Sequence, residues 1–170
     1  MEALMSEPAR IEQMETFEKQ TFRNRALIRD AKGELVRLTI PVKKVEHKQL
    51  TRDIEISYQS HWQHQHWISL VSTYKNTPYF DYYEEFFKPF YEKEYRFLWD
   101  LNSAVHETIM MLLNNLSPTL SQGEREKYAY RCTADWRGEE LNRFFGEGKS
   151  ILDELFEYGP LTVERLGFRV

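Results

Sequence analysis

Alternating apolar and polar positions in the first third of the chain predict a β-hairpin. Within Leu35–Val42 the apolar residues recur at every second position, which is the period of a strand with one buried face. The shorter segment Ala26–Arg29 precedes it, and Gly33 between them can adopt the positive φ that a tight turn requires. Pro41 has no amide hydrogen for the strand ladder and is expected to end the second strand.

Two further segments extend the predicted sheet. Ile54, Ile56 and Tyr58 alternate with polar residues, so a strand is expected over Asp53–Tyr58. Arg10–Glu15 shows a less regular alternation and is a weaker strand candidate. Together with the hairpin, these segments predict a small mixed sheet.

The second half of the chain follows the period of a helix. Apolar positions at i, i+3, i+4 and i+7 begin with Trp67, and the same spacing recurs further on. The helices predicted in this way span Ser60–Asn76, Asp81–Phe87, Pro89–Leu116 and Ile151–Glu157. Ser60 with Gln63, and Ser150 with Asp153, have the spacing of N-terminal capping boxes.

The longest of these helices is strongly amphipathic. Its apolar stripe consists of Leu98, Leu101, Val105, Ile109, Leu112 and Leu116. The expected fold is therefore α/β, with a small mixed sheet that contains a hairpin and is covered by helices, one of them long and amphipathic. Because neither an internal repeat nor a linker interrupts the pattern, residues 1–170 are expected to form one domain.

Composition narrows the class of protein. The chain has 170 residues, 23 Lys and Arg against 27 Asp and Glu, and one cysteine, Cys132, which excludes an intrachain disulfide. No apolar run has the roughly 18 residues of a membrane helix, so we expect a cytoplasmic protein without membrane insertion. The overall charge of −4 argues against a broad nucleic-acid surface.

Positive charge is nevertheless concentrated in one region. Lys19–Arg52 holds ten bases and three acids, an excess of seven positive charges. Within it, a dense polar loop offers one ammonium group, two planar guanidinium groups and two amides, which together suit a phosphate or carboxylate ligand. These candidates are Lys19, Gln20, Arg23, Asn24 and Arg25. The alternative is an exposed connection in which the charges are only solvated.

Three histidines lie close together at the start of the first predicted helix. His61 and His64 are three residues apart, and His66 is displaced from them. Because no acidic residue is close in sequence, a metal site is not expected. His64 and His66 are candidates for a general acid or base, since the ordinary pKa of histidine lies near neutral pH. The alternative is a solvent-exposed polar helix face.

An aromatic segment is the last candidate. Tyr79 and Asp81 lie in Pro78-Tyr-Phe-Asp-Tyr-Tyr83, which could form a stacking wall for a sugar ring or could pack in the core. No phosphate-binding glycine loop or dinucleotide fingerprint occurs, and no cofactor is expected.

Several short segments, taken in order, resemble the WbqC-like protein family. Phe17-Glu-Lys-Gln-Thr-Phe-Arg-Asn-Arg25 is similar to the family's F-x-K-x-x-x-R-N-R segment, and Ser150-Ile-Leu-Asp-Glu-Leu-Phe156 with Gly159-Pro160 is similar to its S-I-L-D-L-L-F-x-x-G-P block. Between them lie the matching elements Leu38-Thr-Ile-Pro-Val42, Trp62-Gln-His-Gln-His-Trp67, Tyr74-x-x-x-Pro-Tyr-Phe80, Tyr82-Tyr83 and Phe90-Tyr91.

The resemblance also shows two departures. The family's first strand and loop have no counterpart before Pro8, and Leu116–Gly148 is compressed, so that only Asp135 and Arg137 match there. If that loop supplies ligand contacts, this chain lacks them.

What the resemblance implies is a role in bacterial surface polysaccharide (O-antigen) synthesis, with aminoacyl (glycyl) transfer to a sugar as the activity. The leading hypothesis is a transferase for a small anionic or sugar-linked substrate. A non-catalytic nucleotide-sugar-binding or accessory protein of the same pathway is the alternative, and nucleic-acid binding is the third. Whether the chain forms a homo-oligomer stays open.

Overall fold

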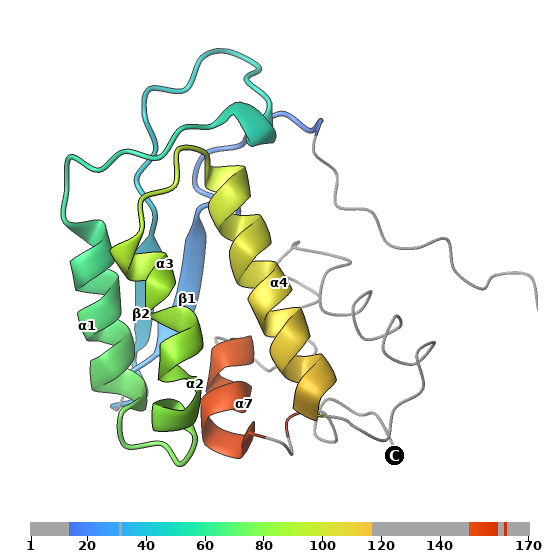
Figure 1. The fold of residues 1–170 in the computed structure, drawn as a ribbon. Coiled ribbons are helices and arrows are strands. Elements are labelled where there is room, and N and C mark those ends of the chain that lie inside the picture. The colour runs from blue at the N-terminus through green and yellow to red at the C-terminus, as the bar shows by residue number, and fades with distance from the viewer. Residues whose placement is uncertain (1–13, 31, 117–149, 160–161, 163–170) are drawn as a thin grey trace, which may run out of the picture.

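The computed structural model describes residues 14–30, 32–116, 150–159 and 162, in which helices pack around a two-stranded sheet (Figure 1). β1 (Arg25–Arg29) pairs antiparallel with β2 (Leu35–Thr39). The register places Arg25 opposite Thr39, and Gly33 in the connection has a φ of 83°. The predicted hairpin is therefore confirmed, and β2 ends before Pro41. The arrangement is a small α/β fold.

The segment expected to be a third strand is extended only in part. Thr51–Asp53 forms a 3-10 turn, η1, and two isolated antiparallel bridges follow, between Val42 and Ile56 and between Glu55 and Phe97. Because each bridge involves a single pair of residues, the sheet in the described part of the chain consists of the antiparallel hairpin. Its strands run antiparallel, and the expected mixed pairing is not seen there.

The helices follow the predicted order with one correction. They are α1 (Trp62–Tyr74), α2 (Phe80–Phe87), α3 (Pro89–Glu92), α4 (Leu98–Leu116) and α7 (Ile151–Tyr158).

The single helix predicted over Pro89–Leu116 is wrong, because an extended segment separates α3 from α4. The Ile56 amide donates to the Arg96 carbonyl at 3.0 Å, and the Leu98 amide donates to the Ile54 carbonyl at 2.8 Å. The Tyr58 hydroxyl bonds both the amide and the carbonyl of Tyr95. These distant partners satisfy backbone groups that a continuous helix would otherwise pair.

The two predicted helix caps have different outcomes. Ser150 caps α7 as expected, since its side chain accepts a hydrogen bond from the Asp153 amide and the Asp153 carboxylate accepts one from the Ser150 amide. The prediction for Ser60 is wrong. The N-cap of α1 is His61 and has no side-chain cap, while Gln63 donates to the Lys93 carbonyl at 2.7 Å.

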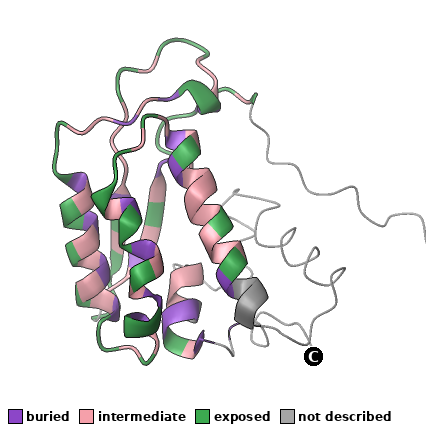
Figure 2. Cartoon of the chain, viewed as in Figure 1, coloured by how far each residue is buried: buried purple, intermediate pink, exposed green. Residues whose placement is uncertain are grey.

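The core joins the hairpin to the inner sides of the helices, and buried positions recur along each helix (Figure 2). In the apolar stripe of α4, Leu98, Leu101 and Leu112 are buried, whereas Val105 and Ile109 are half-buried. The side chain of Leu116 lies outside the described residues. Among the helices that the structure describes, none combines the length and the apolar character needed to cross a membrane.

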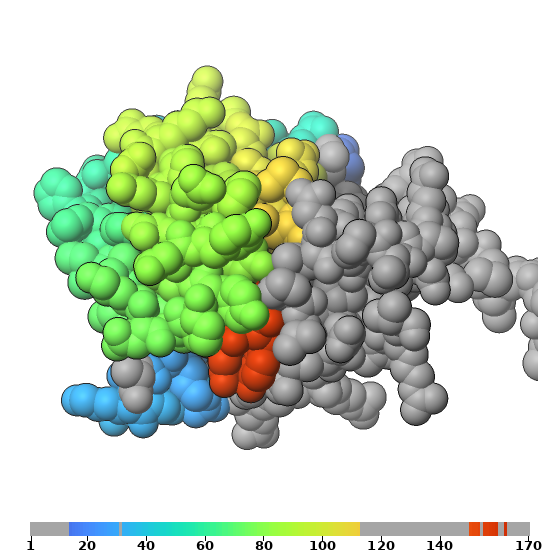
Figure 3. All heavy atoms as spheres, turned by 60° about the horizontal axis from the view of Figure 1, so that its bottom comes forward, coloured from blue at the N-terminus to red at the C-terminus, as the bar shows by residue number. Residues whose placement is uncertain are grey.

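α7 closes this core between α2 and the hairpin (Figure 3). The Phe156 ring lies 4.8 Å from that of Tyr74 and 5.3 Å from that of Phe80, centroid to centroid. The Tyr74 hydroxyl also donates to Asp153 at 2.6 Å, so α7 is bound to α1 by both an apolar and a polar contact.

Candidate functional site

The basic loop, Lys19–Arg25, leads directly into β1, and Arg23 within it is already paired. Its Nε and Nη2 donate to the two carboxylate oxygens of Glu15 at 2.8 and 2.7 Å, and its Nη1 lies 3.3 Å from Glu18. The hydrogen bonds that Arg23 donates to the Glu15 carboxylate raise the pKa of Arg23 above its ordinary value. The guanidinium is thus held between two acidic groups that precede the loop.

The Asn24 side chain stabilises the hairpin and is not exposed on the surface. It is buried, and its Nδ2 donates to the Ile40 carbonyl at 3.0 Å, which joins the start of β1 to the residue after β2. Nearby, Asn102 of α4 donates to the Arg23 carbonyl at 2.9 Å. Lys19 and Gln20 are exposed in the turn before this anchor.

Arg25 differs from Arg23. Its side chain is half-buried, and its Nε is buried and has no hydrogen-bond partner among the described residues. Because opposite residues of an antiparallel pair point to the same side, Arg25 shares its face of the hairpin with Thr39, and Arg37 lies diagonally from it on that face. Among the described residues, neither Arg25 nor Arg37 forms an ion pair. An anion is the natural partner for a partly desolvated guanidinium.

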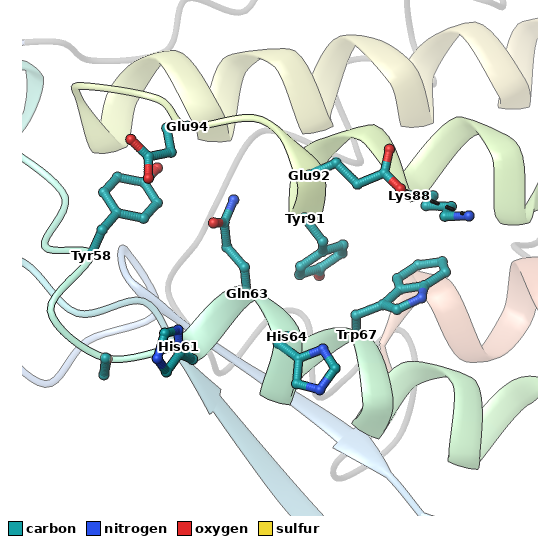
Figure 4. A pocket seen from close by; sticks show the side chains of 10 residues that line it. Tyr58, His61, Gln63, His64, Trp67, Lys88, Tyr91, Glu92 and Glu94 are labelled. Carbon is teal, nitrogen blue, oxygen red and sulfur yellow. Dashed lines mark ion pairs between the residues drawn. The ribbon is translucent and has the colours of Figure 1, made fainter.

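A second candidate site is a pocket of about 460 Å³ between α1 and α3 (Figure 4). α1 contributes Gln63, His64 and Trp67 to its lining, and Tyr91 and Glu92 come from α3. Lys88 and Glu94 flank α3 and add two more charged side chains to the lining. None of the basic-loop residues lines it.

The two histidines predicted as catalytic lie in different environments. His64 is exposed and lines the pocket. His66 is buried between the rings of Trp62 and Tyr91, with centroids 5.1 and 6.3 Å away. Burial lowers the pKa of His66 to about 4, although a backbone hydrogen bond at Thr39 partly opposes this effect. At neutral pH the His66 imidazole is therefore neutral, and of the two only His64 lines the pocket.

Tyr79 and Asp81 lie outside both regions. A Cβ on Gly159 would lie 2.5 Å from the Tyr79 ring, so Tyr79 packs directly on the end of α7. Asp81 is exposed in the first turn of α2. Two other residues singled out from the sequence, Asp135 and Arg137, lie outside the described residues, as does Cys132.

Sequence reasoning missed most of the pocket. The apolar spacing explains Trp67 as a packing residue of α1, and Tyr91 enters the sequence analysis only through the Phe90-Tyr91 match to the family. Both are indeed half-buried, but each also presents part of its ring to the pocket. The sequence signal that could have indicated the pocket is Pro89, because it begins the short helix α3. Glu92 at the end of α3 and Glu94 just after it line the pocket together with residues of α1.

No cluster of three or more potential metal ligands occurs among the described His, Cys, Asp and Glu residues. The fold and the two polar regions define a small α/β protein with an arginine-bearing hairpin face and a separate mixed pocket. The model of the WbqC-like protein family matches residues 11–125, and the chain belongs to this family. The match includes both the basic loop and the pocket. No curated protein and no solved structure gives a significant match to the chain.

Proposed function

We propose that this protein is a cytoplasmic transferase of bacterial surface polysaccharide (O-antigen) synthesis, which moves an aminoacyl (glycyl) group onto a sugar. Family membership supports the pathway. The observation that carries the chemistry is Arg25, a half-buried residue whose buried Nε has no hydrogen-bond partner in the described part of the chain. Nucleotide sugars and activated acyl donors both carry phosphates that such a group binds.

In the proposed reaction the oxygen of a sugar hydroxyl attacks the carbonyl carbon of an acyl phosphate. As the new C–O bond forms, the imidazole of His64 accepts the hydroxyl proton. The bond between the acyl carbon and the phosphate oxygen breaks, and its electron pair leaves with the phosphate. Arg25 stabilises the negative charge of that phosphate, and Arg37 adds a second positive charge on the same face.

The two regions are connected through β2 and α1. Arg25 is paired with Thr39, and the Thr39 backbone forms a hydrogen bond with His66, two residues after His64. The proposal therefore requires an extended substrate with its anionic end at the hairpin and its sugar end at the pocket.

The proposal is tested by calorimetric titration of nucleotide sugars and acyl phosphates into the wild type, Arg25→Ala, Arg25→Lys and Lys44→Ala. Loss of a charge-assisted, bidentate contact of about 1.5–3 kcal/mol should weaken binding about ten- to a hundredfold. Arg25→Lys should be nearly as damaging, because lysine lacks the planar fork. Lys44 is exposed and serves as the control.

Product formation is then followed by mass spectrometry of the sugar, with wild type and His64→Ala compared. Wild-type binding by a folded Arg25→Ala protein would contradict the anion site. Saturable binding without any transferred group would favour a non-catalytic accessory protein instead.

A further inference from the structure

We infer that the α1–α3 pocket binds an uncharged pyranose ring, stacked on Trp67 and oriented by Gln63 and Glu92. This assignment rests on the proposed function only for the role of His64, and it names the class of group that the site takes. Four observations carry it, beginning with the aromatic wall.

Trp67 and Tyr91 form an apolar wall of suitable size. Their ring centroids are 5.6 Å apart and their planes are inclined by 38°. Trp67 is further fixed by Phe80, at 6.4 Å on the core side. The C–H face of a pyranose packs on such rings, and an amphipathic aromatic residue can keep its other edge in water.

Gln63 offers an oriented acceptor. Its Nε2 donates to the carbonyls of Lys93 and Phe90 at 2.7 and 3.4 Å, which fixes the plane of the amide. Its Oε1 forms no hydrogen bond to a described residue. Because both donor positions are engaged in holding α3, the remaining oxygen can accept from a sugar hydroxyl without reorganisation.

Charged groups of both signs also line the pocket. Lys88 Nζ lies 3.7 Å from a carboxylate oxygen of Glu92, and both side chains are about half or more exposed (Figure 4). Neighbouring sugar hydroxyls both donate and accept, so an ammonium next to a carboxylate matches a pair of them.

The charge of the lining argues against a phosphate here. The lining contains one lysine, Lys88, and two carboxylates, Glu92 and Glu94, so these three side chains together carry a net charge of −1. A phosphate would be repelled by both acids, whereas a neutral ring would not. The pocket thus differs in charge from the Arg25 face of the hairpin.

The experiment uses saturation-transfer NMR and tryptophan fluorescence with methyl glycosides of common hexoses and N-acetylhexosamines at millimolar concentration. At least one glycoside should bind the wild type saturably. Trp67→Ala should weaken binding at least about tenfold, and Glu92→Gln about fivefold. Tyr82→Ala serves as the control and should bind glycosides like the wild type. Tyr82 is an aromatic residue of α2 that is 67% exposed and lies outside the pocket.

Because Trp67 also packs on the core, circular dichroism establishes that each variant folds, and Glu92→Gln alters only an exposed carboxylate. If no glycoside binds the wild type, or if Trp67→Ala and Glu92→Gln both fold and bind normally, the inference is wrong. Binding of tetramethylammonium in place of glycosides would also overturn it, by showing a cation site on the same rings.

Failure of this inference is distinguishable from failure of the proposed function. Nucleotide sugars that bind through Arg25 while neutral glycosides do not would remove the pyranose site and leave the anion site. Neutral glycosides that bind while phosphate-bearing ligands do not would support the pyranose site and remove the anion site.

Discussion

His66 links the stability of the protein to pH. Its pKa is about 4 in the folded protein and about 6.5 when the chain unfolds, so the unfolded state takes up the proton first as pH falls. The part of the free energy of unfolding that depends on the neutral imidazole is fully present above pH 6.5 and is lost as the pH falls toward 4. At pH 5 this loss is on the order of 2 kcal/mol.

The measurement is urea denaturation of wild type and His66→Phe at pH 7 and pH 5. The free energy of unfolding should fall further with acidification in the wild type, because only the wild type has the His66 imidazole. The carboxylates common to both proteins cancel in the comparison. Equal losses in the two proteins would contradict a buried, neutral His66.

At the scale of single residues, the sequence located the polar cluster but could not divide it by role. Arg23 and Arg25 are identical in type and two positions apart. What separates them is Glu15, which reaches Arg23 from eight residues earlier, and the burial of the Arg25 Nε. Asn24 is likewise committed to the Ile40 carbonyl, a partner that exists only once the hairpin has formed.

Among the elements, α4 offers a direct test of its apolar stripe. Leu101 is 3% exposed, and truncation to alanine should lower the free energy of unfolding by about 2–5 kcal/mol through lost burial and a cavity. Met111 on the same helix is 42% exposed, so Met111→Ala should change stability by no more than about 0.5 kcal/mol. Chemical denaturation measures both. Similar values for the two variants would show that the stripe does not face the core.

Local signals predicted some element boundaries and missed others for a physical reason. The capping box of α7 involves only Ser150 and Asp153, so four residues of sequence contain the whole motif. The break between α3 and α4 depends on hydrogen bonds from the Ile54–Tyr58 segment, about forty residues away. The pocket shares this origin, because its α3 wall is set by that break.

On the scale of the whole molecule, α7 joins parts of the chain that are far apart in sequence. Phe156 contacts rings from α1 and α2, and the Asp153 carboxylate accepts a hydrogen bond from the Tyr74 hydroxyl. Burial, together with the Asp153 carboxylate, raises the pKa of Tyr74, so the hydroxyl remains a donor at neutral pH. The described residues of α7 are thus part of the same core as the first half of the chain.

This shared core predicts that the described elements unfold together. Phe156 is 2% exposed, and Phe156→Ala should lower the free energy of unfolding by about 3–5 kcal/mol, since it removes ring contacts to two other helices. Glu157→Ala, an exposed position next to it, should stay within about 0.5 kcal/mol. Denaturation is followed by far-UV circular dichroism for the helices and by tryptophan fluorescence for the surroundings of the four indoles, two of which, Trp62 and Trp67, lie on α1. Both signals should shift to lower denaturant by the same amount in Phe156→Ala, because α7 and the described helices that carry indoles belong to one cooperative unit. A loss of helical signal with the fluorescence transition unchanged would show instead that α7 melts by itself, and that the chain is not one cooperative domain.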